Sequence, residues 1–440
     1  MGGTVRGVTA LGRKDAKRMR QFNFRKYCYV FLWLALVLTV GIVWFFGGKS
    51  GEAPPEIPAE SGLESSGGPS ATPLPADQTL TPPQEAEEEL AGVWVPYMSL
   101  NTEEKTQEAF ESNYKRIADS AKAKGINALF VHVRAFSDAL YPSEYFPWSH
   151  VLTGEQGKDP GYDPLAFMVE YAHEQGMEFH AWINPLRVKT DQTPAALSGE
   201  NPYSQLAADY PYYFMEYGGG VYLNPAHAYV RSLIADGAAE IVRGYQVDGI
   251  HFDDYFYPSQ EEQLDSDSYA LYVQNVETPL PLEEWRTANI NAMVAEVYRK
   301  IKQENPEVSF GISPQGNIQN DENMGADVKA WCAVPGYLDY ICPQLYYSFE
   351  NAALGYAQAL EEWMALPRHE GLEVYAGLAL YKAGTDADDG TWLSSGDNIA
   401  RQIDAAREAL CAGVVLYSSD YLDREETGEE VKNAMAALTG

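Results

Sequence analysis

The adjacent acids Asp253 and Asp254 stand where the β-rich segment VDGIHFD turns polar. Hydrolysis of a glycosidic linkage commonly uses two carboxylates that flank the scissile bond, one as base or nucleophile and one as acid. The acid must stay protonated while its partner is ionised, and a difference in surroundings achieves this. We therefore predict that Asp253 is catalytic and works with a second acid, for which Asp254 is the adjacent candidate.

The second acid stays open, because spacing along the sequence does not choose among several residues. The candidates, each of which follows a β-rich run, are Asp254, Asp138, Glu350 and Asp420. A competing interpretation is that Asp253 only neutralises a buried arginine, either Arg134 or Arg187. Structural ion pairs also perturb acids, so a buried acid alone does not establish catalysis.

Further polar side chains follow the same kind of run. Side chains alternate along a strand, so residues two apart share a face. If alternate residues face inward, Arg134, Asn184 and Asp253 form one layer at the strand ends. The residues that we predict to bind substrate are Arg134, Asp138, Trp182, Asn184, Arg187, His251, Tyr255, Gln315, Gln344 and Tyr346.

Aromatic residues crowd these segments as well. Ligand pockets are commonly lined by aromatic side chains, and sugar rings stack on aromatic faces through their C–H surfaces. The aromatic candidates are Trp148, Trp182, Tyr255, Tyr257, Tyr346 and Tyr347. Each residue taken singly is explained equally well by core or loop packing, so their clustering is what favours a binding site.

Three histidines on β-rich runs raise the alternative of a metal-dependent hydrolase. His132, His180 and His251 match the number of protein ligands in a catalytic zinc site. They lie at different depths along their runs, and the sequence contains no H-x-H or H-E-x-x-H spacing. Isolated strand histidines are usually hydrogen-bonded core groups, so we predict neither a metal site nor a cofactor.

β-Rich runs and amphipathic helical stretches alternate from Gly92 to the end of the chain. The predicted strands are 92–97, 128–134, 178–183, 247–253, 308–313, 338–344, 373–378 and 413–418. The predicted helices are 105–124, 164–175, 229–244, 282–304, 327–332, 354–366, 398–410 and 429–438. Eight such units predict an α/β (β/α)8 TIM barrel, whose active site forms at the carboxyl ends of the strands.

The N-terminal part predicts a membrane anchor. Residues 27–47 carry no charge and are long enough to cross the ~30 Å hydrocarbon core as one helix. The basic tail, residues 1–26, should stay in the cytoplasm, which places the rest outside the cell membrane as a single-pass protein. Residues 48–91, rich in Pro and Glu, predict a disordered linker before a globular domain at 92–440. The alternative is a cleaved signal peptide, whose apolar region is usually shorter.

The charge balance excludes one class of partner. The chain has 31 basic and 63 acidic residues, and a net charge of −32 repels DNA and RNA. Of the four cysteines, three follow the apolar segment, and this odd number predicts no disulfide framework. The sequence indicates no particular protein partner.

A set of motifs along the globular part resembles a known family. In chain order they include GVWVPY, FHAWINPLRV, VDGIHFDDYFYP, FGISPQGN and YICPQLYYS. This set resembles the glycosyl-hydrolase-like family 10, also called domain of unknown function 187, from about Gly92 to the C-terminus. The resemblance implies a TIM-barrel glycosidase that acts outside the cytoplasm, and one kind of member cleaves peptidoglycan strands stripped of their stem peptides.

The resemblance also assigns site residues. The family's signature positions fall on Arg134, Asp138, Asn184, Arg187, Asp253, Asp254, Gln344 and Tyr346. This sequence departs from the pattern at His132, where a Gln is expected, and at Asn224, where an Asp is expected. These departures concern substrate subsites rather than the fold.

Cell-wall glycan is the partner that the resemblance implies. A peptide-stripped strand carries lactyl carboxylates, which Arg134 and Arg187 are suited to bind bidentately. The alternative is a barrel that holds cell-wall glycan without cutting it, which the missing obvious second carboxylate favours.

Overall fold

The computed structural model describes residues 89–253 and 256–439. The predicted tail 1–26, the predicted anchor 27–47 and nearly all of the predicted linker 48–91 lie outside the described residues, as do Asp254 and Tyr255. Within the described part of the chain, no helix is long and apolar enough to span a membrane.

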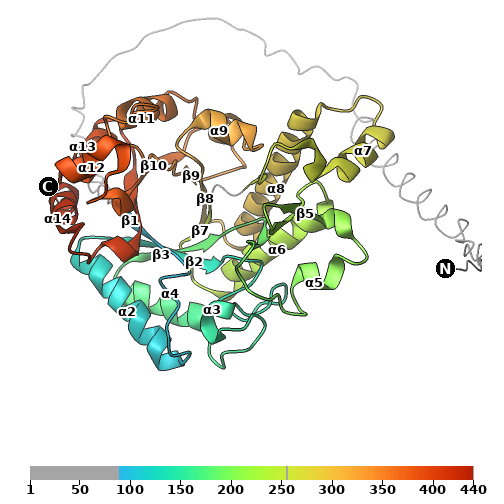
Figure 1. Cartoon of the computed structure of the whole chain (residues 1–440), viewed down its shortest axis with the longest axis horizontal. Coiled ribbons are helices and arrows are strands. Elements are labelled where there is room, and N and C mark those ends of the chain that lie inside the picture. Colours follow the sequence, from blue (N-terminus) through green and yellow to red (C-terminus); the bar gives the residue numbers. More distant parts are fainter. Residues whose placement is uncertain (1–88, 254–255, 440) are drawn as a thin grey trace, which may run out of the picture. The chain divides into compact units, whose positions relative to one another are not determined.

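Eight parallel strands close into a barrel, in the order β1-β11-β10-β9-β8-β7-β3-β2 (Figure 1). Their bounds are β1 Leu90–Val95, β2 Ala128–Arg134, β3 Glu178–Ile183, β7 Gly249–Asp253, β8 Ser309–Ser313, β9 Tyr340–Ile341, β10 Glu373–Leu378 and β11 Gly413–Tyr417. Each contains or overlaps one predicted strand, so the predicted (β/α)8 barrel is confirmed. β1 begins at Leu90 rather than Gly92, and β9 is shorter than predicted because Pro343 has no N–H to continue the ladder.

Helices surround the closed sheet (Figure 1). The longer ones are α2 Gln107–Ala123, α4 Pro164–Glu174, α6 Ala228–Gly244, α8 Leu282–Glu304, α11 Tyr356–Met364, α13 Asn398–Glu408 and α14 Gly428–Thr439. α2 illustrates why they form: Thr106 accepts a hydrogen bond from the N–H of Ala109 at its start, and the buried Phe110, Tyr114 and Ile117 recur at helical spacing. The buried side chains of these helices belong to the same hydrophobic core as the outward-facing residues of the strands.

A small antiparallel sheet lies between β3 and α6 in the sequence and was not predicted. Its strands are β4 Arg187–Lys189, β5 Phe214–Tyr217 and β6 Gly220–Leu223, in the order β4-β6-β5. Strands of three or four residues give too little alternation to be recognised, and the Gly218–Gly219 turn that joins β5 to β6 reads as a loop. The five-residue helix α5 Pro202–Leu206 is too short to show a helical period, and α7 Ser266–Asn275 buries Ser268 but no apolar residue, so it has no apolar stripe to recognise.

The interior of the barrel is separate from the core beneath the helices. Outward-facing residues such as Val93, Leu129 and Ile250 belong to the large core between strands and helices. The interior cluster consists of Leu90, Trp94, Ala128, Phe130, Trp182, Tyr340, Cys342, Tyr375 and Val415. The barrel is therefore a packed core whose top layer forms the floor of whatever cavity lies at the strand ends.

Candidate active site at the carboxyl ends of the strands

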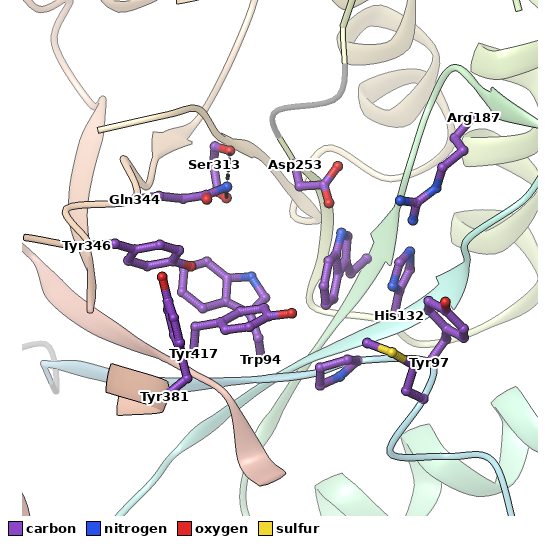
Figure 2. A pocket seen from close by; sticks show the side chains of 13 residues that line it. Trp94, Tyr97, His132, Arg187, Asp253, Ser313, Gln344, Tyr346, Tyr381 and Tyr417 are labelled. Carbon is purple, nitrogen blue, oxygen red and sulfur yellow. Dashed lines mark hydrogen bonds between the residues drawn. The ribbon is translucent and has the colours of Figure 1, made fainter. Parts of the chain in front are cut away.

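A cavity of about 320 Å³ opens at the carboxyl ends of the barrel strands. The described residues that line it are Trp94, Pro96, Tyr97, Met98, His132, Trp182, Arg187, Asp253, Ser313, Gln344, Tyr346, Tyr381 and Tyr417. Five of the predicted site residues are among them, namely Trp182, Arg187, Asp253, Gln344 and Tyr346. Figure 2 shows acid, arginine and histidine on one side of this cavity and a group of tyrosines on the other.

Asp253 ends β7 and is 4% exposed. The amide nitrogen of Asn184 donates to its Oδ1, and the Asn184 Oδ1 accepts from Nη2 of Arg187. Asn184 is 1% exposed and does not line the cavity itself. The side-chain amide of Asn184 therefore orients both the Asp253 carboxylate and the Arg187 guanidinium, because its NH2 group can only donate and its oxygen can only accept.

Arg187 is held from several directions. Its Nε donates to the carbonyl oxygen of Ala135 at 3.0 Å, and its guanidinium lies 4.8 Å from the centroid of the Phe136 ring. The hydroxyl of Ser137 donates to the backbone oxygen of Arg187 at 3.2 Å. The loop after β2 thus fixes the side chain and the backbone of Arg187, which makes it a rigid cation at the edge of the cavity.

His132 forms the floor of the cavity together with Trp182. The two rings stack with centroids 3.9 Å apart, and His132 is 2% exposed. Burial, followed by the positive charge of Arg187, holds the pKa of His132 well below its ordinary value. The ring is therefore neutral at pH 7 and serves as an aromatic surface rather than a second cation.

Tyrosines make the opposite wall. The ring centroids of Tyr346, Tyr381 and Tyr417 lie 5.8 to 6.0 Å from one another. Trp94 continues this wall, with its ring 6.1 Å from that of Tyr417. Burial, with the charges of Asp253 and Asp420, raises the pKa of Tyr417 to about 12. Tyr417 is therefore a neutral phenol at physiological pH, available as a hydrogen-bond donor near the acid.

A partly buried ion pair supports this aromatic wall. Lys382 donates to the backbone oxygen of Tyr346 at 2.7 Å and to Asp388 at 3.2 Å. Asp388 also accepts from the N–H of Ser348 and from the indole N–H of Trp392. The loops that follow β9 and β10 are thereby joined, which holds Tyr346 and Tyr381 at fixed positions.

The prediction that Arg134 faces the barrel interior is wrong. A bulge in β2 places His132 opposite Trp182 of β3 but Arg134 opposite Ile183, so one residue of β2 is extra and the inward alternation ends. The guanidinium lies 4.4 Å from the Phe146 ring centroid and donates to the backbone oxygen of Ile234 on α6. Arg134 therefore packs between the barrel and a helix, away from the cavity.

Two further predicted substrate ligands do not reach the cavity. His251 is fully buried beneath its floor, where it accepts a hydrogen bond from Trp94. Gln315 lies outside the lining residues; its N–H donates to Asp321, and its side chain accepts from Asn320. Residues one or two positions along a strand differ in depth by several ångströms, which sequence alternation does not resolve.

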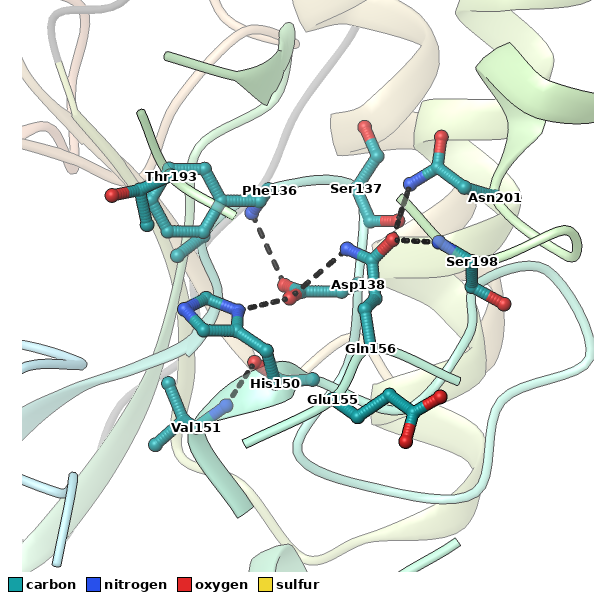
Figure 3. A network of polar contacts seen from close by, with 12 residues as sticks. Phe136, Ser137, Asp138, His150, Val151, Glu155, Gln156, Thr193, Ser198 and Asn201 are labelled. Atoms are coloured by element: carbon teal, nitrogen blue, oxygen red, sulfur yellow. Dashed lines mark hydrogen bonds and ion pairs between the residues drawn. The ribbon is translucent and has the colours of Figure 1, made fainter. Parts of the chain in front are cut away.

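Asp138 is also fully buried outside the cavity (Figure 3). It accepts hydrogen bonds from the N–H of Phe136 and the amide of Gln156, and it lies 3.5 Å from Nδ1 of His150. Gln156 in turn accepts from the amide of Asn201. This network ties together the loops that follow β2 and β3, so Asp138 acts on the site through the loop that holds Arg187.

Two more candidates for the second acid, Glu350 and Asp420, do not line the cavity. Asp253 is the one carboxylate among the described lining residues. The side chain of Glu350 is 54% exposed and lies 3.8 Å from Arg401, and Asp420 is exposed on the loop after β11. Asp254 and Tyr255 fall in the two-residue gap of the description, so their predicted roles stay predictions.

The described residues do not favour the metal alternative. They contain no group of three or more His, Cys, Asp or Glu side chains placed to hold a metal ion. His180 and His251 both contact the hydroxyl of Tyr340, whereas His132 stacks on Trp182. The three histidines thus serve as hydrogen-bonding and packing groups at different depths.

Sequence reasoning missed part of the aromatic lining. Trp94 lies near the end of the first barrel strand, Tyr97 follows that strand, and Tyr381 follows the seventh, yet none of them was among the predicted site residues. The rule that barrel sites form at strand ends applied to them as well, since GVWVPY ends a strand. Of the six aromatic candidates, Trp182 and Tyr346 line the cavity, while Trp148, Tyr257 and Tyr347 do not.

Comparison with known proteins agrees with this architecture. The model of the glycosyl hydrolase-like 10 family matches residues 89–394. The glycosyl hydrolase YngK of Bacillus subtilis is 33% identical over 374 residues, which cover 78% of this chain and 71% of the relative. The glycosyl hydrolase DigH of Escherichia coli is 31% identical over 403 residues, 81% of this chain and 91% of the relative.

Among solved structures, the PgaB (BpsB) glycoside hydrolase domain from Bordetella bronchiseptica superposes with a TM-score of 0.52 at 13% identity. The match covers 79% of this chain and 99% of that chain, and at this identity it shows a shared fold alone. The family predicted from the motifs is confirmed by the family model and by both relatives. The chain belongs to the glycosyl hydrolase-like 10 family.

Proposed function

We propose that the protein is a glycoside hydrolase that cleaves cell-wall glycan, with Asp253 as one of its catalytic carboxylates. The observation that carries the proposal is the position of Asp253, a nearly buried acid at the end of β7 in a cavity whose opposite wall is aromatic. A carboxylate that faces aromatic surfaces on which sugar rings can stack supplies one of the two acids that hydrolysis of a glycosidic bond commonly uses.

The second carboxylate of the proposed mechanism is Asp254. It follows Asp253 directly, and Asp138, Glu350 and Asp420 lie away from the cavity. In this mechanism one acid protonates the leaving oxygen while the other attacks the sugar or activates water. Asn184 supports Asp253 by a hydrogen bond, and Tyr417 presents a neutral phenol from the facing wall of the cavity.

The proposed substrate is a peptidoglycan strand stripped of its stem peptides. Arg187 supports this choice because it places a rigid guanidinium in the cavity of a chain whose net charge is −32. A guanidinium pairs bidentately with a carboxylate such as the lactyl group of a stripped strand. It also lets an acidic protein hold an anionic polymer.

The direct test is digestion of peptide-stripped peptidoglycan by a fragment of residues 84–440, which contains the entire closed barrel. Products are read by mass spectrometry. We expect new reducing ends with the wild-type fragment and none with Asp253→Asn. Asp254→Asn tests the second acid in the same assay, and full activity in that variant would reject its role.

A glycan-binding barrel without catalysis is the second candidate function. It is favoured by the finding that Asp253 is the one acid among the described lining residues. The two functions separate in one experiment: if stripped strands pull the wild-type fragment down but stay uncut, the barrel is a binding module.

We further propose that the barrel works outside the cell, anchored by residues 27–47. The uncharged run and its basic flank support this placement. In intact cells, added protease should degrade the barrel, and the full-length chain should sediment with membranes. A chain without residues 1–47 that still sedimented with washed membranes would argue against this anchor.

A further inference from the structure

A column of hydrogen-bonded side chains runs through the barrel interior, from the cavity to the opposite end. At the top, Nε1 of Trp94 donates to Nε2 of His251 at 3.1 Å. Nδ1 of His251 lies 3.0 Å from the hydroxyl of Tyr340. That hydroxyl lies 3.3 Å from Nδ1 of His180, whose Nε2 lies 3.0 Å from Glu178. Glu178 begins β3, so the column spans the barrel.

The two ends of the column determine where every proton lies. An indole N–H only donates, so Nε2 of His251 must be the unprotonated, accepting nitrogen. A neutral His251 then carries its proton on Nδ1 and donates it to the oxygen of Tyr340. The hydroxyl of Tyr340 donates in turn to His180. Burial, together with His180, lowers the pKa of His251 well below its ordinary value, which keeps the ring neutral.

The lower half follows the same direction. His180 accepts at Nδ1, so its proton is on Nε2 and is donated to the carboxylate of Glu178. An ionised carboxylate can accept hydrogen bonds but cannot donate them. The hydrogen bond with His180 is the main reason that the pKa of Glu178 is lowered, which favours the ionised form. The column therefore has one internally consistent arrangement of donors and acceptors, fixed by Trp94 and Glu178.

The sequence leaves room for this column. A Cβ atom at Gly249 would lie 2.2 Å from Nδ1 of His180, and one at Gly311 would lie 2.1 Å from the Tyr340 ring. Phe130 stacks on His180 with ring centroids 4.4 Å apart. Glycines at two inward-facing strand positions and an aromatic clamp thus accommodate large polar side chains where a TIM barrel usually holds aliphatic ones.

The column orients the Trp94 ring and does not conduct protons. An indole nitrogen has no lone pair to accept a proton, so the column cannot deliver a proton to the cavity. Trp94 lines the cavity, and its Nε1–H donates its hydrogen bond to Nε2 of His251. The column therefore controls the plane of an aromatic ring that the substrate meets.

We propose that His251, Tyr340 and His180 are positioning residues that hold the Trp94 indole in the orientation that binds a sugar ring. The part of the proposal that concerns sugar rests on the proposed function, whereas the hold on Trp94 does not. His251, predicted from the sequence as a substrate ligand, is thereby assigned an indirect role.

A matched pair of variants tests the column. Tyr340→Phe removes the hydroxyl at its centre. Tyr375→Phe removes the hydroxyl of a neighbouring interior tyrosine, 5.0 Å away between ring centroids, which bonds Glu373 outside the column. The full-length protein is labelled with ¹⁵N at tryptophan, and the Trp94 indole resonance is assigned by its loss in Trp94→Phe.

We expect the Trp94 resonance to move and its hydrogen exchange to accelerate in Tyr340→Phe but not in Tyr375→Phe. Without the Tyr340 oxygen, Nδ1 of His251 has no acceptor for its proton, and the tautomer with the proton on Nε2 becomes accessible. In that tautomer Nε2 cannot accept a hydrogen bond from the Trp94 indole. Equal resonances in the two variants would overturn the proposal. Glu178→Ala, at the end of the column whose side chain is 55% exposed, should move the resonance in the same direction by less.

Kinetics add a readout that a purely structural role would not move. We expect KM for the glycan to rise roughly 3- to 10-fold in Tyr340→Phe, as for one lost hydrogen bond, with kcat within about twofold because Asp253 is untouched. A fall in kcat at constant KM would contradict a positioning role. If the wild-type protein shows no turnover, the proposed function fails while the resonance comparison still decides the column.

Discussion

The two ends of β7 carry the same side chain in different surroundings. Asp248, just before the strand, accepts hydrogen bonds from the N–H of Phe179 at 2.7 Å and from Nε2 of His173 at 2.8 Å. Asp253, at the end of the strand, lines the cavity together with Arg187. One aspartate completes the sheet at the amino end of the barrel, and the other faces the space where a substrate enters.

The amino end repeats this pattern on other strands. Asp339, which precedes β9, accepts from the N–H of Phe310, and Asn127, which precedes β2, accepts from the N–H of Ala91. The side chain of a polar residue ahead of a strand thus accepts from the N–H of the second residue of a neighbouring strand, which would otherwise lack a partner. The comparison teaches that acids at the amino end of the barrel complete the sheet, whereas Asp253 at the carboxyl end faces the cavity.

The strongest test of this difference between the two ends of β7 is to neutralise Asp253 at the carboxyl end. Asp253→Asn should lower kcat roughly 10²- to 10⁴-fold, the range for loss of one acid–base group, because Asn retains the shape but cannot ionise. Turnover of peptide-stripped strands measures kcat, and thermal unfolding should stay within a few degrees of the wild type. Substantial residual turnover would move catalysis to another residue.

The cation beside the acid gives the next largest effect. Arg187→Ala should raise KM roughly 10- to 100-fold on stripped strands, because a charge-assisted contact with a carboxylate is lost. Neutral oligosaccharides of N-acetylglucosamine serve as the control substrate and should lose much less. Arg187→Lys should recover part of the affinity; equal losses on charged and neutral glycans would refute carboxylate recognition.

At the amino end the effect should appear in stability alone. Asp248→Ala leaves the N–H of Phe179 without its acceptor, and we expect the free energy of unfolding to fall by about 1–2 kcal/mol. Urea denaturation measures this loss, and kcat/KM at 25 °C should match the wild type. A large loss of activity in the folded variant would show that the two ends are not separable.

An effect of similar size, which appears only when the pH changes, lies in the helical shell, away from both ends. Burial raises the pKa of Glu430 to about 7, although the N–H of Ile399 donates to it. Because the pKa in the folded state lies above the ordinary value of 4.5, the neutral form stabilises the fold. That contribution is complete below about pH 4.5 and is lost as the pH rises to about 7.

The corresponding measurement is unfolding as a function of pH. The wild type should lose about 1–2 kcal/mol of stability between pH 4.5 and pH 8 relative to Glu430→Gln, whose side chain does not titrate. The difference should have no counterpart in kcat. Parallel pH profiles of the two proteins would rule out Glu430 as the titrating group.

The barrel could be predicted from the sequence because its strands are apolar runs with regular helical spacers. Each of the eight predicted strands has its counterpart, and the residues at their ends led to Asp253, Arg187 and Gln344. The sheet β4-β6-β5 could not be predicted, since its strands are too short for alternation to be recognised.

The facing of individual side chains was harder to predict. The bulge in β2 turns Arg134 away from the interior, and no feature of VHVRAF indicates it. His251 faces inward as predicted but lies beneath the cavity floor, so it is not the predicted substrate ligand; its depth depends on the stagger of the neighbouring strands. Sequence patterns thus predict which face of the sheet a side chain lies on more reliably than they predict its depth in the barrel or the position of a β-bulge.

The central claim, that chemistry belongs to the carboxyl end of β7 and stability to its amino end, is tested most directly by one assay on two variants. Asp253→Asn and Asp248→Ala are each incubated with peptide-stripped peptidoglycan at a temperature where both are folded, and new reducing ends are quantified. The account predicts none above background for Asp253→Asn and a wild-type rate for Asp248→Ala. Cleavage by Asp253→Asn at a rate near that of Asp248→Ala would contradict it.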